Sequence, residues 1–532
     1  MSDVARYEFF LFLVSVILAL ELLARRLKLP PAAAFILGGT GLALTPGIPD
    51  ITLDPDLVML VFLPALLMSS AWFTAWREFR RNLSGILLLA VGTTLFTTAA
   101  VGIAAHFMVP ALPWAVCFTI GAIVSPPDAV AAEAALERLS LPRRVTSLLQ
   151  GESLLNDATG LVLFRFGVAA ALTGIFQPFV AIGTFCLVSV GGVIIGLAAG
   201  MAGLYILRRI RDSDVSITIT VLLAEATYIA AEHLDVSGVL ATVTTGLVLG
   251  WHQHTDFEAG TRIRAQAFWK VLVFLLESVL FILIGLSLRG VLSRLQAIPD
   301  ALHNLALPVA AILVVMVGSR FVWLYGSDAI TAVLHRLWPS RFSRPSPAIS
   351  TIMGWAAMRG VVTLTAALSL PEGFPGRDLA LIIAFASILV TVLVQGLTLE
   401  PLITLLRING SSELHGIQSA ENEAWIRVAE AQLKAIERAS HQPDGTERHP
   451  RLLEQYQHRL KAARQYASNT DEHRPEEIAH YQTVLDAIVA GRNEIIALHR
   501  SGHLHDNVLR EMEEAMDMQE IVARSHLGSE HG

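Results

Sequence analysis

Long apolar runs dominate residues 1–406 of this chain and restrict the folds open to it. A helix of about 20 apolar residues spans the hydrocarbon core of a bilayer, whereas a membrane β-barrel requires short alternating segments, which this sequence lacks. Only 16% of the residues are charged, against about 25% in soluble domains. The sequence therefore predicts an all-α polytopic membrane protein with about 13 transmembrane helices. We place these segments near residues 8–24, 31–47, 56–74, 84–107, 112–136, 145–175, 178–207, 215–232, 236–251, 268–288, 305–334, 349–370 and 379–406.

Basic residues alternate from one connecting loop to the next. Each loop after segments 1, 3, 5, 7, 9 and 11 carries three Lys or Arg residues, as in Arg77, Arg80 and Arg81, whereas the opposite loops carry few. Basic loops remain on the cytoplasmic side of a membrane. We therefore expect a multi-pass protein with its N-terminus outside and its C-terminus in the cytoplasm.

The composition changes at about Arg407. Residues 407–532 are polar and contain 21 acidic and 14 basic residues, so the whole formal charge of −7 belongs to this part. Apolar residues recur there at helical spacing, with breaks near Pro443 and Pro475, which is typical of amphipathic helices that pack together. The sequence thus predicts a transmembrane domain at 1–406 and a helical cytosolic domain at 407–532.

Ionisable side chains inside the apolar segments mark the candidate functional site. The sixth segment holds Glu152, Ser153, Asn156 and Asp157, and Asp128 lies in the segment before it. On a helix, residues four apart lie on one face, so Ser153 and Asp157 should point the same way. Ionisable groups are costly within a bilayer and are retained there mainly for function.

Two segments are expected to be broken helices. Pro126 and Pro127 lack the N–H groups that a helix needs, so the fifth segment should open beside Asp128 and free main-chain carbonyls. The twelfth segment is interrupted at 354–360, around Arg359, a buried charge that requires a counter-charge. Broken helices line the binding sites of many transporters. The two breaks are seven segments apart, as an inverted repeat of segments 1–6 and 8–13 would place them.

These residue types suit the binding of a small cation or a proton. Hard monovalent cations prefer oxygen ligands, which Asp128, Asp157, the Ser153 hydroxyl and freed carbonyls supply. Loss of water raises the pKa of a carboxyl group from about 4 toward neutrality, so one carboxylate can hold either a proton or a cation. The residues therefore favour a transporter, neither an enzyme nor a cofactor-dependent protein. A cation channel, an intramembrane aspartyl hydrolase with Asp128 and Asp157 as its dyad, and a membrane scaffold remain the alternatives.

Three stretches, 125–131, 151–157 and 358–360, resemble signature stretches of the bacterial Na⁺/H⁺ antiporters of the cation:proton antiporter 1 family, within the sodium/hydrogen exchangers. The resemblance extends over about 1–406. It implies a homodimer of thirteen-helix subunits in the bacterial inner membrane, with a core domain that moves against a dimerisation domain. It implies exchange of Na⁺ for H⁺, with Li⁺ or K⁺ as alternative cations and a K⁺-preferring exchanger as the second hypothesis. Neither a cofactor nor a nucleic-acid partner is implied.

The resemblance also assigns roles to individual residues. Asp157 would be the exchanging carboxylate, with Asp128, Ser153 and the Pro127 carbonyl as Na⁺ ligands. Asn156 and Glu152 would brace the site, and Arg359 would pair with a carboxylate, Glu152 first. An asparagine at position 156 resembles the electroneutral branch, which exchanges one cation for one proton.

Two departures from the family pattern leave the cation preference open. Asp128 is flanked by Pro127 and Ala129 where many relatives have Thr and Pro, and Met68-Ser69 stands where some relatives place a glutamate.

Further charged residues occur within the spans. For Arg320 we expect Glu232 or Glu277 as partner. Arg165 either reaches out toward the membrane surface or modulates the site, and Glu225 has no evident role.

Overall fold

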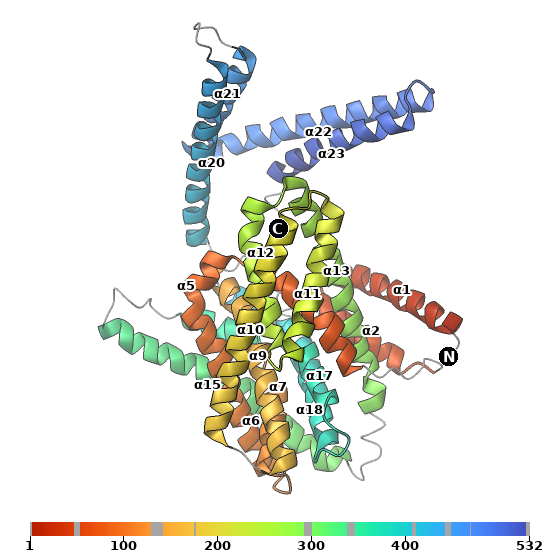
Figure 1. Cartoon of the computed structure of the whole chain (residues 1–532), viewed down its shortest axis with the longest axis vertical. Helices are drawn as coiled ribbons and strands as arrows, with labels where there is room; N and C mark the ends of the chain where they lie inside the picture. The colour runs from red at the N-terminus through yellow and green to blue at the C-terminus, as the bar shows by residue number, and fades with distance from the viewer. Residues whose placement is uncertain are drawn as a thin grey trace. The chain divides into compact units, whose positions relative to one another are not determined.

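The computed structural model describes residues 3–46, 54–128, 142–174, 177–291, 301–337, 346–406, 411–441, 448–468 and 470–527. The chain divides into two compact units, Met1–Ile408 and Asn409–Gly532. Figure 1 shows that the described parts of both units are built from helices, as predicted. The helices of the first unit are α1 (Asp3–Leu27), α2 (Pro31–Ala43), α3 (Pro55–Leu57), η1 (Val58–Phe62), α4 (Leu63–Phe73), α5 (Trp76–Leu87), η2 (Leu88–Thr93), α6 (Thr94–Met108), α7 (Trp114–Val124), α9 (Arg143–Thr173), α10 (Pro178–Leu207), α11 (Ser213–His233), α12 (Gly238–Asp256), α13 (Ala259–Leu286), α15 (Ala301–Leu337), α16 (Pro347–Trp355), α17 (Val361–Leu368), α18 (Arg377–Val390), η3 (Thr391–Gln395) and α19 (Gly396–Leu405).

Many of these helices suit a bilayer. Within the described residues, eight helical stretches are long and apolar enough to cross a membrane, and the shorter apolar helices α2 and α7 add to them. The prediction of an all-α polytopic membrane protein is confirmed. The count of thirteen spans stays a prediction, as does the internal repeat.

Within the first unit, the helices contact one another mainly in two groups. In what we call the first bundle, α2 packs against α13, and α12 packs against α4, α10 and α11. In the second bundle, α6 packs against α7 and α15, and α9 packs against α5 and α7. Glycines allow the closest approaches: a Cβ on Gly39 would overlap the α13 main chain, and one on Gly121 would overlap that of α6. Small residues of this kind are common where membrane helices pack.

The two predicted helix breaks are present. α7 ends at Val124 and the chain is not helical from Ser125 to Asp128, while the rest of the predicted fifth segment lies outside the described residues. α16 ends at Trp355, and α17 begins only at Val361. Because α16 packs against α15 and α17 packs against α7, we count both breaks in the second bundle.

The second unit consists of helical hairpins. α20 packs against α21, and α22 packs against α23 (Figure 1). An ion pair between Arg464 and Glu430 joins the first two helices, at 2.7 Å, and Arg492 joins the other two through Asp517 and Glu520. The bounds are α20 (Ser411–Ser440), α21 (Pro450–Ser468), α22 (Thr470–Arg500) and α23 (Asp506–Leu527).

Candidate ion-binding site

The two helix breaks meet at the candidate site. The Asp128 N–H donates a hydrogen bond to the Met358 carbonyl, at 2.8 Å. Next to this bond the backbone of Gly360 lies so close that a Cβ there would overlap the Asp128 carboxylate. The glycine is therefore required by the close approach of one break to the other. The bond between the breaks fixes Asp128 at the point where α7 has ended.

Arg359 stabilises both breaks through main-chain carbonyls. Its Nε donates to the Val124 carbonyl at 2.5 Å, one of its terminal nitrogens donates to the Ala357 carbonyl at 3.0 Å, and its own N–H donates to Thr391 Oγ1 at 2.9 Å. The two side-chain bonds satisfy carbonyls that the helix ends leave without donors. Among the described residues no carboxylate forms an ion pair with Arg359, so the predicted pairing with Glu152 is wrong.

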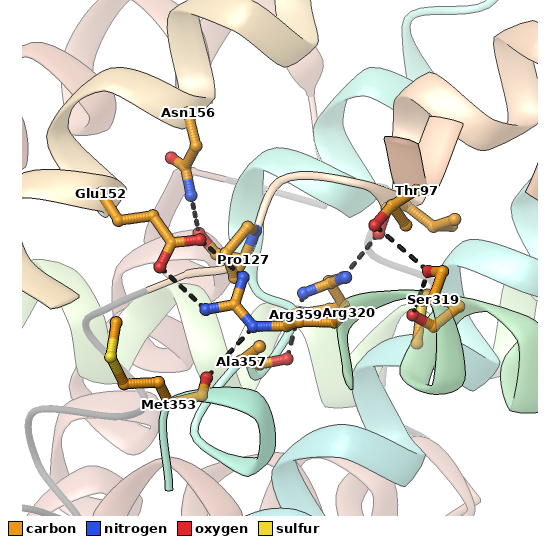
Figure 2. Close-up of polar contacts among 11 residues, drawn as sticks. Thr97, Pro127, Glu152, Asn156, Ser319, Arg320, Met353, Ala357 and Arg359 are labelled. Atoms are coloured by element: carbon orange, nitrogen blue, oxygen red, sulfur yellow. Dashed lines mark hydrogen bonds and ion pairs between the residues drawn. The ribbon is translucent and has the colours of Figure 1, made fainter. Parts of the chain in front are cut away.

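Glu152 instead pairs with Arg320. The two side chains form a bidentate ion pair between α9 and α15, at 2.5 and 2.8 Å, and both are only 2% exposed (Figure 2). Arg320 Nε also donates to the Met353 carbonyl at 3.1 Å. The expectation that Arg320 pairs with Glu232 or Glu277 is therefore also wrong. A planar guanidinium can donate two parallel hydrogen bonds to a carboxylate in this way. The Nε of Arg320 remains free to bind the Met353 carbonyl in α16, just before the second break.

Asn156 connects α9 to the first break. Its side-chain amide donates to the Pro127 carbonyl at 2.6 Å, and both groups are buried (Figure 2). A carbonyl oxygen has two lone pairs, so this hydrogen bond leaves one of them for another donor or for a cation. The contact explains why an amide N–H is useful at position 156.

A cavity of about 60 Å³ brings together the three predicted side-chain ligands, whereas Pro127 is not among its lining residues. Asp128, Ser153 and Asp157 line it, and Asp157 is 8% exposed. Its other polar lining residues come from the first bundle: Ser70, at the end of α4, and Glu277, on α13. The remaining walls are apolar side chains of η1, α4, α13 and α17, together with Leu154 of α9. The cavity therefore lies between the two bundles, and both contribute oxygen atoms to it.

Comparison with known proteins gives the family. The family model for the transmembrane part of sodium/hydrogen exchangers matches residues 11–405. This chain belongs to the sodium/hydrogen exchanger family. An uncharacterized Na⁺/H⁺ exchanger of Mycobacterium tuberculosis is 29% identical over 96% of this chain and 94% of its own length. The Na⁺/H⁺ antiporter NhaH of Halobacillus dabanensis is 29% identical over 74% of this chain and 96% of its own.

One further relative is informative about the fold, and another about the cations that the family transports. The sodium proton antiporter MjNhaP1 of Methanocaldococcus jannaschii, solved at pH 8, has a similar fold, with a TM-score of 0.58 and 19% identity over 74% of this chain and 98% of that one. A sodium, potassium, lithium and rubidium/H⁺ antiporter of Bacillus subtilis is 31% identical over 66% of this chain and 54% of its own length.

Membership of the family decides between the classes of function. The exchanger is a multi-pass membrane protein that exchanges cations for protons. It is therefore a transporter and not an enzyme, and it needs no cofactor besides the ions that it transports. The hydrolase, channel and scaffold alternatives are thereby set aside.

An ion pair also links the two bundles of the exchanger. Arg165, two turns beyond Asp157 on α9, pairs with Glu232 on α11 at 2.6 Å. The other carboxylate oxygen of Glu232 accepts from the Gly238 N–H at 3.4 Å, where α12 begins. Arg165 is 58% exposed and Glu232 is 28% exposed. Arg165 thus has a partner in the first bundle that the sequence alone did not identify.

Glu277 is the cavity residue whose place the sequence analysis missed. It lies in an apolar run of α13, and the sequence suggests it only as a partner of Arg320. The rule that selected Asp157, a carboxylate within a spanning segment, applies equally to Glu277.

Proposed function

We propose that Asp157 is the carboxylate that binds a proton and a monovalent cation in turn, and that Asp128, Ser153 and the Pro127 carbonyl are further cation ligands. The observation that carries this proposal is the single cavity that Asp128, Ser153 and Asp157 share. Asn156, Glu152 and Arg359 support the site. Each of them holds a part of α9 or of a helix break in place, and none of them lines the cavity.

The chemistry of the ligands explains the competition between the two ions. Carboxylate, hydroxyl and carbonyl oxygens suit hard cations, and a proton on Asp157 removes the negative charge that a cation requires there. Binding of one ion therefore excludes the other on the same oxygens. Na⁺ is the expected cation. The range of cations in the name of the Bacillus subtilis relative supports testing K⁺, Li⁺ and Rb⁺ beside it.

We further propose one-for-one exchange by a homodimer in the bacterial inner membrane, with the N-terminus outside and the C-terminal tail, 407–532, in the cytoplasm. The alternation of basic loops supports this orientation. The asparagine at position 156 and the family resemblance support the stoichiometry and the dimer. The cavity between the bundles suits alternating access, because a movement of one bundle against the other changes the side from which the cavity can be reached.

Proton flux into proteoliposomes tests the assignment of Asp157. Asp157→Asn keeps the shape of the side chain and removes its exchangeable proton, so cation-dependent flux should vanish. Glu225→Gln is the matched control, since Glu225 lies within the span α11 but does not line the cavity. Wild-type flux in Asp157→Asn would refute the role of Asp157. Loss of flux in both variants would refute the importance of the cavity.

The same vesicles test the stoichiometry. One-for-one exchange moves no net charge, so an imposed membrane voltage should leave the rate unchanged. A rate that follows the voltage would refute electroneutral exchange and would leave the ligand assignment standing.

A further inference from the structure

Basic and aromatic side chains surround two adjoining cavities away from the ion site. The smaller, of about 410 Å³, is lined by Trp76, Arg77, Arg80 and Arg81 of α5 and by Trp251 of α12. The larger, of about 670 Å³, shares Trp76, Arg77 and Trp251 with it and continues along the ends of α4 and α12 and the start of α13. We call the five residues of the smaller cavity the arginine–tryptophan pocket.

The three arginines of the pocket are exposed and have no acidic partner within the part of the chain that the structure describes. None of them forms an ion pair or a hydrogen bond with a described residue through its side chain, whereas Arg165 and Arg208 elsewhere in the same unit both pair with carboxylates. Positions 77, 80 and 81 are three and four apart, so the like charges lie on one helix face and repel one another. An anion held among them would relieve this repulsion.

The aromatic residues give the pocket a wall. The Trp76 ring stacks on Phe79, with centroids 6.0 Å apart, and meets the edge of Trp251 at 6.4 Å. α5 begins directly at this wall, and Ala75 before it offers no side-chain acceptor to the first N–H groups of the helix. The positive end of the helix therefore adds to the field of the arginines. A phosphate, which carries several acceptor oxygens, matches this set of donors.

The surroundings of the pocket indicate where such a phosphate comes from. The stretch from Trp76 to Met108, which begins with α5, is one of those apolar enough to cross a membrane, so the pocket lies at the end of a span. Leu83, Leu87 and Leu88, further along this span, are exposed. An acyl chain attached to a phosphate in the pocket would find apolar surface there, which inorganic phosphate could not use. Tryptophans and basic pockets at helix ends are typical of contacts with lipid headgroups.

We propose that the arginine–tryptophan pocket binds the phosphate headgroup of an anionic lipid. α5 packs against α9, which carries Asp157, whereas Trp251 belongs to α12 of the first bundle. The lipid therefore contacts both bundles at their joint. This binding is independent of the roles proposed for the ion ligands.

Lipid binding to the purified full-length exchanger in detergent tests the proposal. Native mass spectrometry would compare phosphatidylglycerol, cardiolipin and phosphatidylcholine, with inorganic phosphate as competitor. The test variant is Arg80→Gln with Arg81→Gln. The matched control is Arg26→Gln with Lys28→Gln, which removes two exposed charges from the end of α1 and its following turn. At about 1 kcal/mol for each charge near a membrane surface, the loss of Arg80 and Arg81 should weaken anionic-lipid binding roughly 30-fold.

Three outcomes decide the proposal. Selective weakening in the Arg80/Arg81 variant, with the control near wild type, supports it. Equal weakening in both variants would show that surface charge alone attracts the lipid and would overturn it. Displacement of the lipid by millimolar inorganic phosphate would also overturn it, since the site would then select a free anion.

Trp251→Ala keeps every charge, and it should still weaken binding several-fold because it removes the aromatic wall.

Discussion

Removal of the Glu152 carboxylate is expected to destabilise the exchanger strongly. Glu152 and Arg320 form a bidentate pair in which both side chains are 2% exposed. Breaking a buried pair by removing one partner costs about 3–5 kcal/mol, because the remaining charge is left without water or a counter-charge. The free energy of unfolding of Glu152→Gln should fall by an amount in this range.

The two partners of the pair are not equivalent, because a second guanidinium is buried beside them. Arg359 is also 2% exposed, and its charged neighbours are Arg320 and Glu152. Glu152→Gln removes the carboxylate that pairs with Arg320 and that also attracts the charge of Arg359 without forming an ion pair with it, whereas Arg320→Gln leaves that attraction in place. We therefore expect Glu152→Gln at the upper end of the range and Arg320→Gln at the lower end, near about 3 kcal/mol.

Thermal unfolding in detergent can be followed through a buried thiol. Cys117 is buried and Cys186 is exposed, so in a Cys186→Ser background a thiol-reactive dye reports the unfolding of the membrane unit alone. The variant with both Glu152→Gln and Arg320→Gln should lose less stability than the sum of the single variants, by at least about 1 kcal/mol, because the two side chains interact directly.

A more exposed ion pair supplies the control for this experiment. Asp256→Asn breaks the pair with Arg208, whose distance is 2.8 Å and whose arginine is 52% exposed, and surface pairs contribute about 0–1 kcal/mol. If Glu152→Gln unfolds at the same temperature as Asp256→Asn, the buried pair does not stabilise the protein more than a surface pair does. A clearly larger loss in Arg320→Gln than in Glu152→Gln would refute the attraction between Glu152 and Arg359.

Two further predictions concern the cavity. Gly360→Ala should reduce proton flux by at least about tenfold, because the new Cβ must displace the Asp128 carboxylate and even a small misplacement of a site residue can cost that much. The control is Gly318→Ala, where nothing lies within 4 Å of a new Cβ, and it should retain wild-type flux. Equal flux in both variants would contradict the close approach of Gly360 to Asp128. Glu277→Gln removes a negative charge from the cavity wall and should raise the Na⁺ concentration for half-maximal flux roughly three- to tenfold; an unchanged value would show that Glu277 does not act on the ion.

The breaks and the candidate ligands could be predicted because each has a local cause. Pro126 and Pro127 remove helix donors wherever the fold places them, and carboxylates at 128 and 157 are costly in any membrane helix. Such arguments need only the neighbouring residues. The breaks at 125–128 and 356–360 therefore appear in the structure where the sequence placed them.

The partners of the buried charges could not be predicted in this way. Glu152 and Arg320 are 168 residues apart, and the sequence offered Arg359 as an equally buried candidate. The choice depends on which arginine the packing of α15 and α16 brings to α9. Main-chain carbonyls also satisfy Arg359, and every residue has a carbonyl, so composition cannot reveal such acceptors.

The distribution of the described ion pairs would suit the proposed movement of one bundle against the other during exchange. The Glu152–Arg320 pair joins α9 to α15 within the second bundle and is buried, so breaking it would be costly. Among the described residues, the pair Arg165–Glu232 crosses between the bundles; its side chains are 58% and 28% exposed, so it should contribute only about 0–1 kcal/mol. Water can replace each partner of this pair at little cost when the bundles separate. A relative movement can therefore open the joint beside the ion cavity and leave the network that holds Asp128 and Asp157 intact.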